Sequence, residues 1–279
     1  MWMKTLAAFL LSILALPGAT TPPIEDFTRF SEFESFELSP DGQRLAITRR
    51  SDAEELLVVL DVDTLEPISS STFGERTHIE DVFWVNNDRL LVQPASRFPG
   101  MTDGYLPTGE ILGIDADGTG VKLLFGARAQ RGRIGARSRS ASELQFPGRV
   151  VTLLRDDDDH VIVQSYGWDL RGEFNRSFKL NVYTGRAKRL QRSPVRNGTF
   201  VTDTLGNIAL VHGVADDGSL VVYAFDASGG SRVLHDSNAD NGLLIPLRAW
   251  PDPDPAGHPR FLVREQILGA TTGLALWTP

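Results

Sequence analysis

The residues that could do chemistry in this chain are histidines, clustered acids and one serine beside glycines. A hydrolytic triad needs a serine activated by a histidine that a carboxylate orients. No Gly-x-Ser-x-Gly segment occurs, and the nearest approach, Gly229-Gly230-Ser231-Arg232-Val233, lacks the second glycine and is predicted to form a turn. Every histidine lies beside a predicted turn or strand end, which favours surface positions over a catalytic base. These histidines are His78, His160, His212, His235 and His258.

Two acidic clusters could bind a cation or an amine. The run Asp156-Asp157-Asp158-Asp159 offers the hard oxygen ligands that calcium uses. Adjacent carboxylates repel each other, and consecutive side chains of an extended chain point to opposite faces, so a solvated turn is favoured. Glu54-Glu55 follows a predicted hairpin turn at Ser51-Asp52 and is also expected to be solvated.

Other site motifs are missing from the sequence. It contains no His-Glu-x-x-His, no EF-hand spacing, no P-loop and no Gly-x-Gly-x-x-Gly. Because there is no cysteine, disulfides, thiolate catalysis and cysteine-ligated metals are excluded. The sequence therefore assigns no catalytic, cofactor-binding or metal-ligating residue, and we expect no cofactor.

The overall charge argues against nucleic acid as a partner. The chain has 279 residues and a formal net charge of −8, whereas a phosphate backbone requires a basic face. One segment, 126–148, is rich in arginine, and between its first and last arginine there is neither an acid nor an aromatic residue for base stacking. A solvated loop is favoured there over a polyanion-binding loop. Its arginines are Arg128, Arg131, Arg133, Arg137 and Arg139.

A short sequence pattern, here called the turn phrase, recurs along the chain and predicts the elements that position these residues. A turn rich in Asp, Asn or Gly leads into a short apolar strand, a second strand follows, and an Asp or Asn turn closes the unit. Repeats of roughly 40–50 residues built from short strands are typical of a β-propeller. The opening segments are 39–47, 84–92, 158–163 and 202–210, the closing segments are 60–64, 114–118, 180–185 and 225–230, and a fifth copy begins near 253–263.

The repeats predict an all-β fold, a β-propeller over residues 24–279 with about four complete blades plus a partial fifth, hence an incomplete ring. Aligned positions are Leu45, Leu90, Val161, Ile208 and Phe261. The segment 24–36, with a phenylalanine at every third position from Phe27 to Phe36, fits either a short helical face or an extended lead-in.

The N-terminus predicts an export signal over residues 1–19. One lysine precedes an eleven-residue apolar core, Leu6–Leu16, and small residues follow it. This core is too short to span a bilayer comfortably. A cleaved signal is favoured over an uncleaved anchor or a buried strand, so we expect a periplasmic or secreted bacterial protein without a stable membrane anchor.

The ordered phrases resemble the N-terminal β-propeller of exported bacterial prolyl oligopeptidase-family (S9) serine peptidases. The resemblance rests on Phe36-Glu37-Leu38-Ser39-Pro40-Asp41-Gly42, Asn87-Asp88-Arg89-Leu90 and Gly113-Ile114-Asp115-Ala116-Asp117-Gly118, followed by Leu180-Asn181-Val182-Tyr183-Thr184-Gly185 and Thr202-Asp203-Thr204-Leu205-Gly206-Asn207. It implies a propeller that covers a C-terminal α/β-hydrolase domain and admits only short peptides. No catalytic serine, aspartate or histidine of that family has a counterpart here.

Two functions follow as expectations. The first is a non-catalytic, gating or substrate-filtering propeller of an S9-like peptidase, truncated before its hydrolase domain. Its partners would be short peptide substrates or the missing hydrolase domain. The second is a stand-alone periplasmic propeller that binds a protein or a small ligand. An unclosed ring would also expose blade edges, through which we expect self-association.

Overall fold

The computed structural model describes residues 32–50, 54–97, 104–129, 146–166, 174–226, 228–240, 242–267 and 271–279. The predicted export signal, together with Phe27 and Phe30, lies outside these residues. The described parts contain strands and no helix, so none of their elements is a helix able to cross a membrane. Phe33–Leu38 is a strand, so the extended alternative holds for that part of the phenylalanine series.

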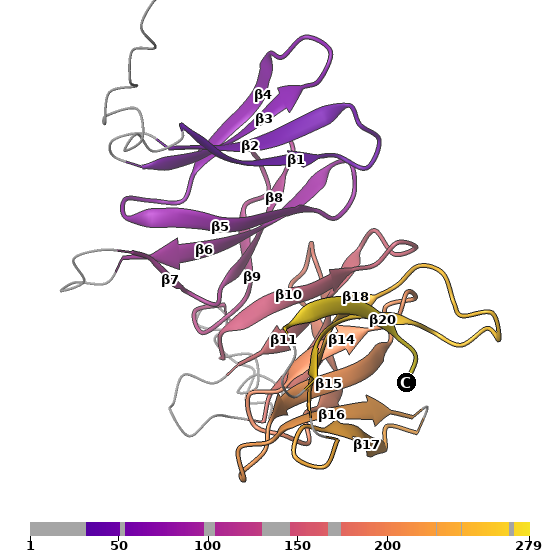
Figure 1. The fold of residues 1–279 in the computed structure, drawn as a ribbon. Helices are drawn as coiled ribbons and strands as arrows, with labels where there is room; N and C mark the ends of the chain where they lie inside the picture. The colour runs from indigo at the N-terminus through magenta and orange to yellow at the C-terminus, as the bar shows by residue number, and fades with distance from the viewer. Residues whose placement is uncertain are drawn as a thin grey trace, which may run out of the picture. The chain divides into compact units, whose positions relative to one another are not determined.

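The strands form consecutive antiparallel sheets, as the repeated phrase predicts (Figure 1). Neighbouring strands of a sheet follow each other in sequence, except that in sheet 2 both β7 and β8 pair with β6, and each sheet is one copy of the repeat. Sheet 1 consists of β1 (Phe33–Leu38), β2 (Arg44–Arg50), β3 (Glu55–Asp61) and β4 (Pro67–Thr72); sheet 2 consists of β5 (Thr77–Trp84), β6 (Arg89–Ser96), β7 (Leu106–Pro107), β8 (Ile111–Asp115) and β9 (Lys122–Phe125).

The later sheets repeat this pattern. The fifth has three strands among the described residues. Sheet 3 consists of β10 (Gly148–Leu153), β11 (His160–Ser165), β12 (Arg176–Asn181) and β13 (Ala187–Arg192); sheet 4 of β14 (Thr199–Thr202), β15 (Ile208–Val214), β16 (Leu220–Phe225) and β17 (Ser231–Asp236); sheet 5 of β18 (Gly242–Ala249), β19 (Phe261–Ile267) and β20 (Gly273–Trp277). The fold is thus an all-β propeller with four complete blades and a partial fifth.

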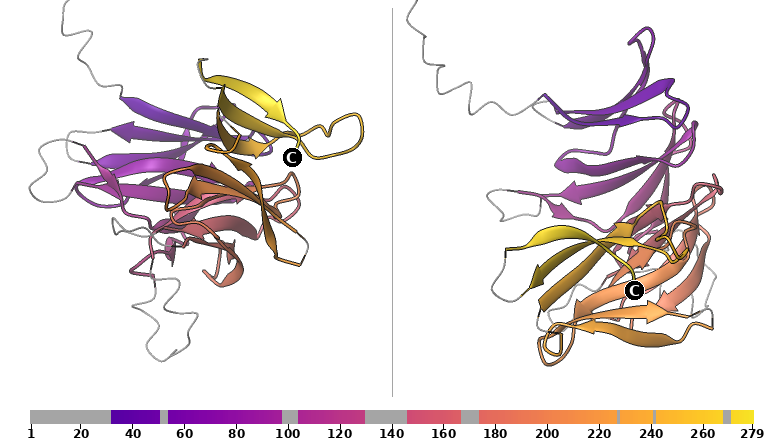
Figure 2. Two further views of the ribbon diagram at one scale, coloured as in Figure 1. Left: turned by 60° about the horizontal axis from the view of Figure 1, so that its bottom comes forward. Right: turned by 45° about the vertical axis from the view of Figure 1, so that its right-hand side comes forward.

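Apolar side chains between the faces of neighbouring sheets hold the blades together. One buried cluster joins sheets 1 and 2 around Trp84 and Leu90, a second joins sheets 2 and 3 around Phe125 and Phe178, and a third joins sheets 4 and 5 around Phe261. Figure 2 shows the fifth sheet, in yellow, beside the strands of the fourth, where β18 contacts β14, β15 and β16. A blade that cannot bury both faces alone is stabilised by such stacking.

Short acidic or amide side chains accept hydrogen bonds from the turn backbone, and this explains why the turn phrase recurs. In the opening turns, Asp41 Oδ1 accepts from Gln43 N and Asp203 Oδ1 accepts from Leu205 N. In the closing turns, Asn181 Oδ1 accepts from Thr184 N and Asp226 Oδ1 accepts from Gly230 N. These side chains replace a backbone partner at the turn, which is the reason that Asp and Asn are selected there.

Candidate ligand site on the inner strands

First strands of neighbouring sheets contact each other: β1 with β5, β10 with β14, and β14 with β18. Between sheets 2 and 3, β10 contacts β8. In a propeller these first strands surround the axis. Residues that face the axis from successive blades therefore form a common surface.

Cross-strand register places equivalent polar residues at one level of this surface. Asp81 on β5 pairs with Gln93 on β6, and Arg149 on β10 pairs with Gln164 on β11. Thr199 on β14 pairs with His212 on β15 in the fourth sheet. The first four of these residues and Thr199 line the same cavity.

This inner cavity has a volume of about 510 Å³. It draws on three blades, and most of its lining residues are polar. The lining residues are Glu80, Asp81, Gln93, Pro107, Arg149, Gln164, Tyr166, Asn175, Asn197 and Thr199.

Two buried glutamines fix the walls of the inner cavity. Gln93 Oε1 accepts a hydrogen bond from Val150 N of the next blade at 3.0 Å. Gln164 Oε1 accepts a hydrogen bond from Phe200 N of the fourth blade at 2.9 Å. Because each amide oxygen satisfies a backbone donor of its neighbour, the glutamines hold two first strands, β10 and β14, against the preceding blades.

The charged residues of the inner cavity are of both signs and are partly desolvated. Burial, followed by the nearby charge of Asp81, raises the pKa of Glu80, and burial alone raises the pKa of Asp81. Burial lowers the pKa of Arg149, which donates from Nη2 to Thr199 Oγ1 at 3.0 Å. Burial and the charge of Glu80 raise the pKa of Tyr166. Several perturbed groups in one cavity are typical of a binding site.

One buried acceptor in this cavity has no protein partner. Asn175 is 3% exposed and donates from Nδ2 to Gly198 O at 2.9 Å, while its Oδ1 has no hydrogen-bond partner. An unsatisfied buried acceptor costs free energy, so a bound molecule or a water with a free N–H or O–H would complete it.

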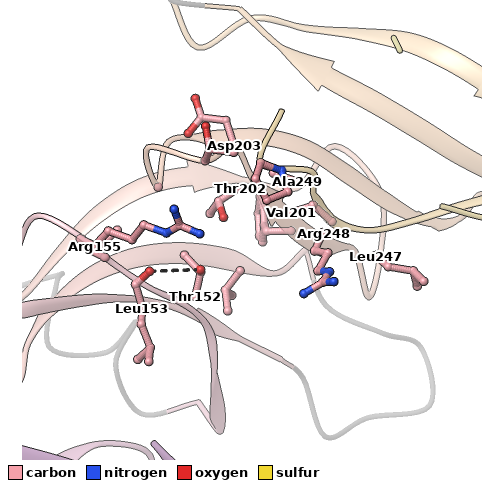
Figure 3. A pocket seen from close by; sticks show the side chains of 15 residues that line it. Thr152, Leu153, Arg155, Val201, Thr202, Asp203, Leu247, Arg248 and Ala249 are labelled. Carbon is pink, nitrogen blue, oxygen red and sulfur yellow. Dashed lines mark hydrogen bonds between the residues drawn. The ribbon is translucent and has the colours of Figure 1, made fainter. Parts of the chain in front are cut away.

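A second cavity of about 190 Å³ lies at the other ends of β10 and β14, next to β18. Figure 3 shows the side chains of Arg155, Thr202 and Arg248 around it. Asp203 belongs to its wall, but its carboxylate already accepts turn hydrogen bonds from Leu205 N and Asn207 N. This end cavity is smaller, and the inner cavity is the better candidate.

The structure confirms some of the expectations for individual residues. Asp157 lies in the predicted turn, where burial favours a higher pKa but ion pairs with Lys179 and His160 outweigh it and lower the pKa to about 2. Gly229 and Gly230 form the turn before β17. Arg128 pairs with the buried Glu110, whereas Arg131, Arg133, Arg137 and Arg139 lie outside the described residues.

Two expectations, for Glu55 and His212, were wrong. Glu55 is not a solvated turn residue: it is 5% exposed on β3 and accepts a hydrogen bond from His78 Nδ1 at 2.6 Å. His78, the second residue of β5, has the strand-end position that was expected, with a side chain that is 24% exposed. His212 is a mid-strand residue whose pKa burial lowers to about 4, with the charges of Arg149 and Arg264 adding to the effect. A buried carboxylate needs a partner, and that pairing is invisible in the sequence.

His235 and His258 occupy the turn and strand-end positions that were expected. His258 Nδ1 lies 3.2 Å from Asp254 Oδ2, and His235 lies at the end of β17 beside Asp240. The inner cavity itself was not found from the sequence. The only available signal was the glutamine that recurs four residues into the second strand, at Gln93 and Gln164.

Comparison with known proteins confirms the fold. No protein-family model matches the chain, and no curated protein matches it. An oligogalacturonate lyase in complex with manganese has a TM-score of 0.50 and 13% identity, over 90% of this chain and 66% of the lyase chain. At these identities the likeness shows the propeller fold.

Two solved acylaminoacyl peptidases, which belong to the S9 family, share the fold as well. One, from Pyrococcus horikoshii, has a TM-score of 0.50 and 17% identity. The other, in complex with Z-Gly-Gly-Phe-chloromethyl ketone, has a TM-score of 0.51 and 15% identity. Each match covers 89% of this chain and 38% of the peptidase chain, so this chain spans well under half the length of those enzymes.

Proposed function

We propose that the chain is a non-catalytic propeller of an S9-like serine peptidase and that its inner cavity admits and positions short peptides. The observation that carries the proposal is the inner cavity, where three blades present acids, an arginine and amides in one polar space. The fold shared with acylaminoacyl peptidases supports it, and so does the ordered series of turn phrases.

The chemistry of the cavity suits a short peptide with free ends. Glu80 and Asp81, adjacent acids at the cavity wall, would receive an ammonium group, which relieves the repulsion that Asp81 exerts on Glu80. Arg149 would receive a carboxylate, because its guanidinium is exposed at the cavity wall and its Nη2 already points to Thr199 within the cavity. Asn175 Oδ1 would accept from a peptide N–H.

Calorimetric titration of the purified chain with the tripeptide Gly-Gly-Phe tests this proposal. We expect binding by the free tripeptide and weaker binding after N-acetylation or C-amidation. Arg149→Met should weaken binding of the free peptide about tenfold or more, since it removes a charge-assisted hydrogen bond. It should leave binding of the C-amidated peptide unchanged. Arg248→Met, in the end cavity, is the matched control and should bind like the unmodified chain.

Failure to bind any of these peptides would contradict the proposal. So would binding that is unchanged by Arg149→Met and by Glu80→Gln. Serine-dependent turnover of chromogenic peptide substrates by this chain alone would contradict its non-catalytic part.

Export is a separate part of the proposal. The charge, apolar core and small residues of segment 1–19 support removal of a signal and release into the periplasm or medium. Mass spectrometry of the protein recovered from a bacterial periplasmic fraction would show a chain shortened by about 19 residues. A full-length chain retained in the cytoplasm would contradict export.

A stand-alone binding propeller is the second candidate. It is favoured by the match to the oligogalacturonate lyase, whose chain this one covers to 66%, and by the arginine in the cavity. Under that alternative, a small acidic sugar should bind with the same dependence on Arg149, and Gly-Gly-Phe should not bind.

A further inference from the structure

We propose that Glu34, Glu55 and His78 form a divalent metal site, selective for Zn²⁺, that joins the first two sheets. The residues come from three strands: Glu34 from β1, Glu55 from β3 and His78 from β5. One ligand atom of each lies within 4.8 Å of the others. The site is separate from the inner cavity, and no part of the proposed peptide binding depends on it.

The three side chains converge on one point. His78 Nδ1 lies 2.6 Å from Glu55 Oε2 and 3.5 Å from Glu34 Oε2. The imidazole nitrogen therefore faces two carboxylates, and a proton on Nδ1 occupies the place between them. A metal ion would replace that proton, because zinc ligands are the unprotonated imidazole nitrogen and ionised carboxylates.

Glu55 provides an independent observation that points to a ligand. Its side chain is 4% exposed, and its second oxygen, Oε1, has no hydrogen-bond partner in the described structure. A buried carboxylate oxygen without a partner destabilises the folded state. A cation bound between the three residues would satisfy it directly or through a coordinated water.

Neighbouring groups hold the two carboxylates in place by hydrogen bonds, as the outer partners of metal ligands do. Ile79 N donates to Glu55 Oε2 at 3.0 Å, and Arg50 Nη1 lies 3.1 Å from Glu34 Oε1. The ring of Tyr105 lies 5.0 Å from that of His78. Glu34 and His78 remain about one-quarter exposed, so an ion can enter from solvent.

The ligand set decides which ion is preferred. One imidazole and two carboxylates with an open position match zinc, which takes three protein ligands and a water in many sites. Ca²⁺ requires six to eight oxygen ligands, and Mg²⁺ gives up its water shell reluctantly. We therefore expect Zn²⁺ to bind most tightly, Mn²⁺ more weakly, and Ca²⁺ and Mg²⁺ least.

The test is calorimetric titration of the chelator-treated full chain with ZnCl₂, together with thermal unfolding. We expect one Zn²⁺ per chain and a rise in the unfolding midpoint of about 5 °C or more at a hundredfold excess over the Kd. Glu34→Gln, which retains the size of the side chain, should weaken Zn²⁺ binding about tenfold or more. Its metal-free midpoint should stay close to that of the parent, since Glu34 is partly exposed.

Two matched controls separate this site from adventitious binding. Glu54→Gln changes the neighbouring acid, and His258→Asn changes an exposed histidine beside Asp254. Both should bind Zn²⁺ like the parent chain. Absence of Zn²⁺ binding would overturn the proposal, and so would binding that persists unchanged in Glu34→Gln and His78→Asn. The unfolding midpoint of Glu55→Gln could also fall below that of the parent by the same amount with Zn²⁺ and with chelator. That result would overturn the metal site and leave only a structural ion pair between Glu55 and His78.

Discussion

At the residue scale, the most informative side chain is His212, because its neighbours in the repeat show what the fold prefers there. It lies four residues into β15, and Gln93 and Gln164 hold the same place in β6 and β11. Burial together with the charges of Arg149 and Arg264 keeps the imidazole neutral, with a pKa of about 4. The fourth blade thus carries a titratable group where its neighbours carry an amide.

His212 should make the fold sensitive to acid between pH 6.5 and pH 4. The unfolded chain takes up a proton on this side chain near pH 6.5 and the folded chain only near pH 4, so stability is present above pH 6.5 and is lost as pH falls. At about 1.4 kcal/mol per pH unit, the loss reaches at most about 3 kcal/mol. Denaturant unfolding at pH 7 and pH 4.5 should show a smaller difference for His212→Gln than for the parent.

The exposed His258 supplies the control for that prediction. His258→Gln should leave the pH dependence unchanged. An equal loss of stability in His212→Gln and the parent between these two pH values would contradict the assigned role of burial.

At the element scale, a repeated arginine links one blade to the next. Arg44 and Arg89 each begin the second strand of their sheet. Arg44 bonds to Asp88 and to the carbonyl of Asn87 in the second blade. Arg89 is 2% exposed, donates to Val182 O of the third blade at 3.0 and 3.1 Å, and pairs with Asp115 at 2.7 Å.

Loss of the buried link should cost more than loss of the exposed one. Arg89→Met should lower the free energy of unfolding by about 3 kcal/mol, because it leaves the Val182 carbonyl unpaired and Asp115 without its partner. Arg44→Met should cost about 1 kcal/mol or less, since Arg44 is about one-third exposed. Urea unfolding of the two variants measures both values, and equal losses would contradict the burial argument.

The acidic turn caps give a second prediction at this scale. Hydrogen bonds from Ser228 and Gly230 lower the pKa of Asp226 below 3.8, so its contribution is present above that pH and is lost as pH falls through the folded pKa. Asp226→Asn should keep the turn at pH 7, as Asn181 does in the third blade, and should lose less stability between pH 4 and pH 2. Thermal unfolding against pH measures the difference, and parallel curves would contradict it.

The sequence was sufficient for these turns because Asp and Asn bond to backbone groups two to four residues away. It was insufficient for the register of the fourth blade. Ile208 is the first residue of β15 and so corresponds to Arg89 and His160, which begin β6 and β11, and not to Leu90 and Val161 as aligned. A one-residue slip moves every side chain to the other face of the sheet. His212 consequently could not be placed beside the two glutamines.

Local sequence patterns also did not predict the contacts between segments that lie far apart in the chain. Arg89 and Val182 lie in different blades, as do Glu55 and His78. The strands were predicted because apolar runs and turn residues are local signals. The inner cavity was not predicted, because it depends on how three such units stack.

At the scale of the whole molecule, we expect the outer edge of the fifth sheet to be a surface for self-association. β20 is the last strand of its sheet, and no further described strand pairs with it. It exposes Leu274 and Leu276, which are 69% and 43% accessible. An edge strand with exposed leucines is a template for another chain.

We expect concentration-dependent association that a charge on this strand suppresses. Leu274→Lys should shift sedimentation toward the monomer, since a lysine on an edge strand opposes pairing. Leu205→Lys, at an exposed turn residue that is 76% accessible, serves as the matched control. A parent chain that stays monomeric at every concentration would contradict this surface.

The central claim is that peptides bind where the first strands of three blades meet. Hydrogen–deuterium exchange of the chain with and without Gly-Gly-Phe tests it most directly. Slower exchange is predicted in β5, β10 and β14, with β19 and β20 unchanged, and the effect should disappear in Arg149→Met. Protection that falls instead on the fifth sheet, or no protection at a peptide concentration that saturates calorimetric binding, would contradict the claim.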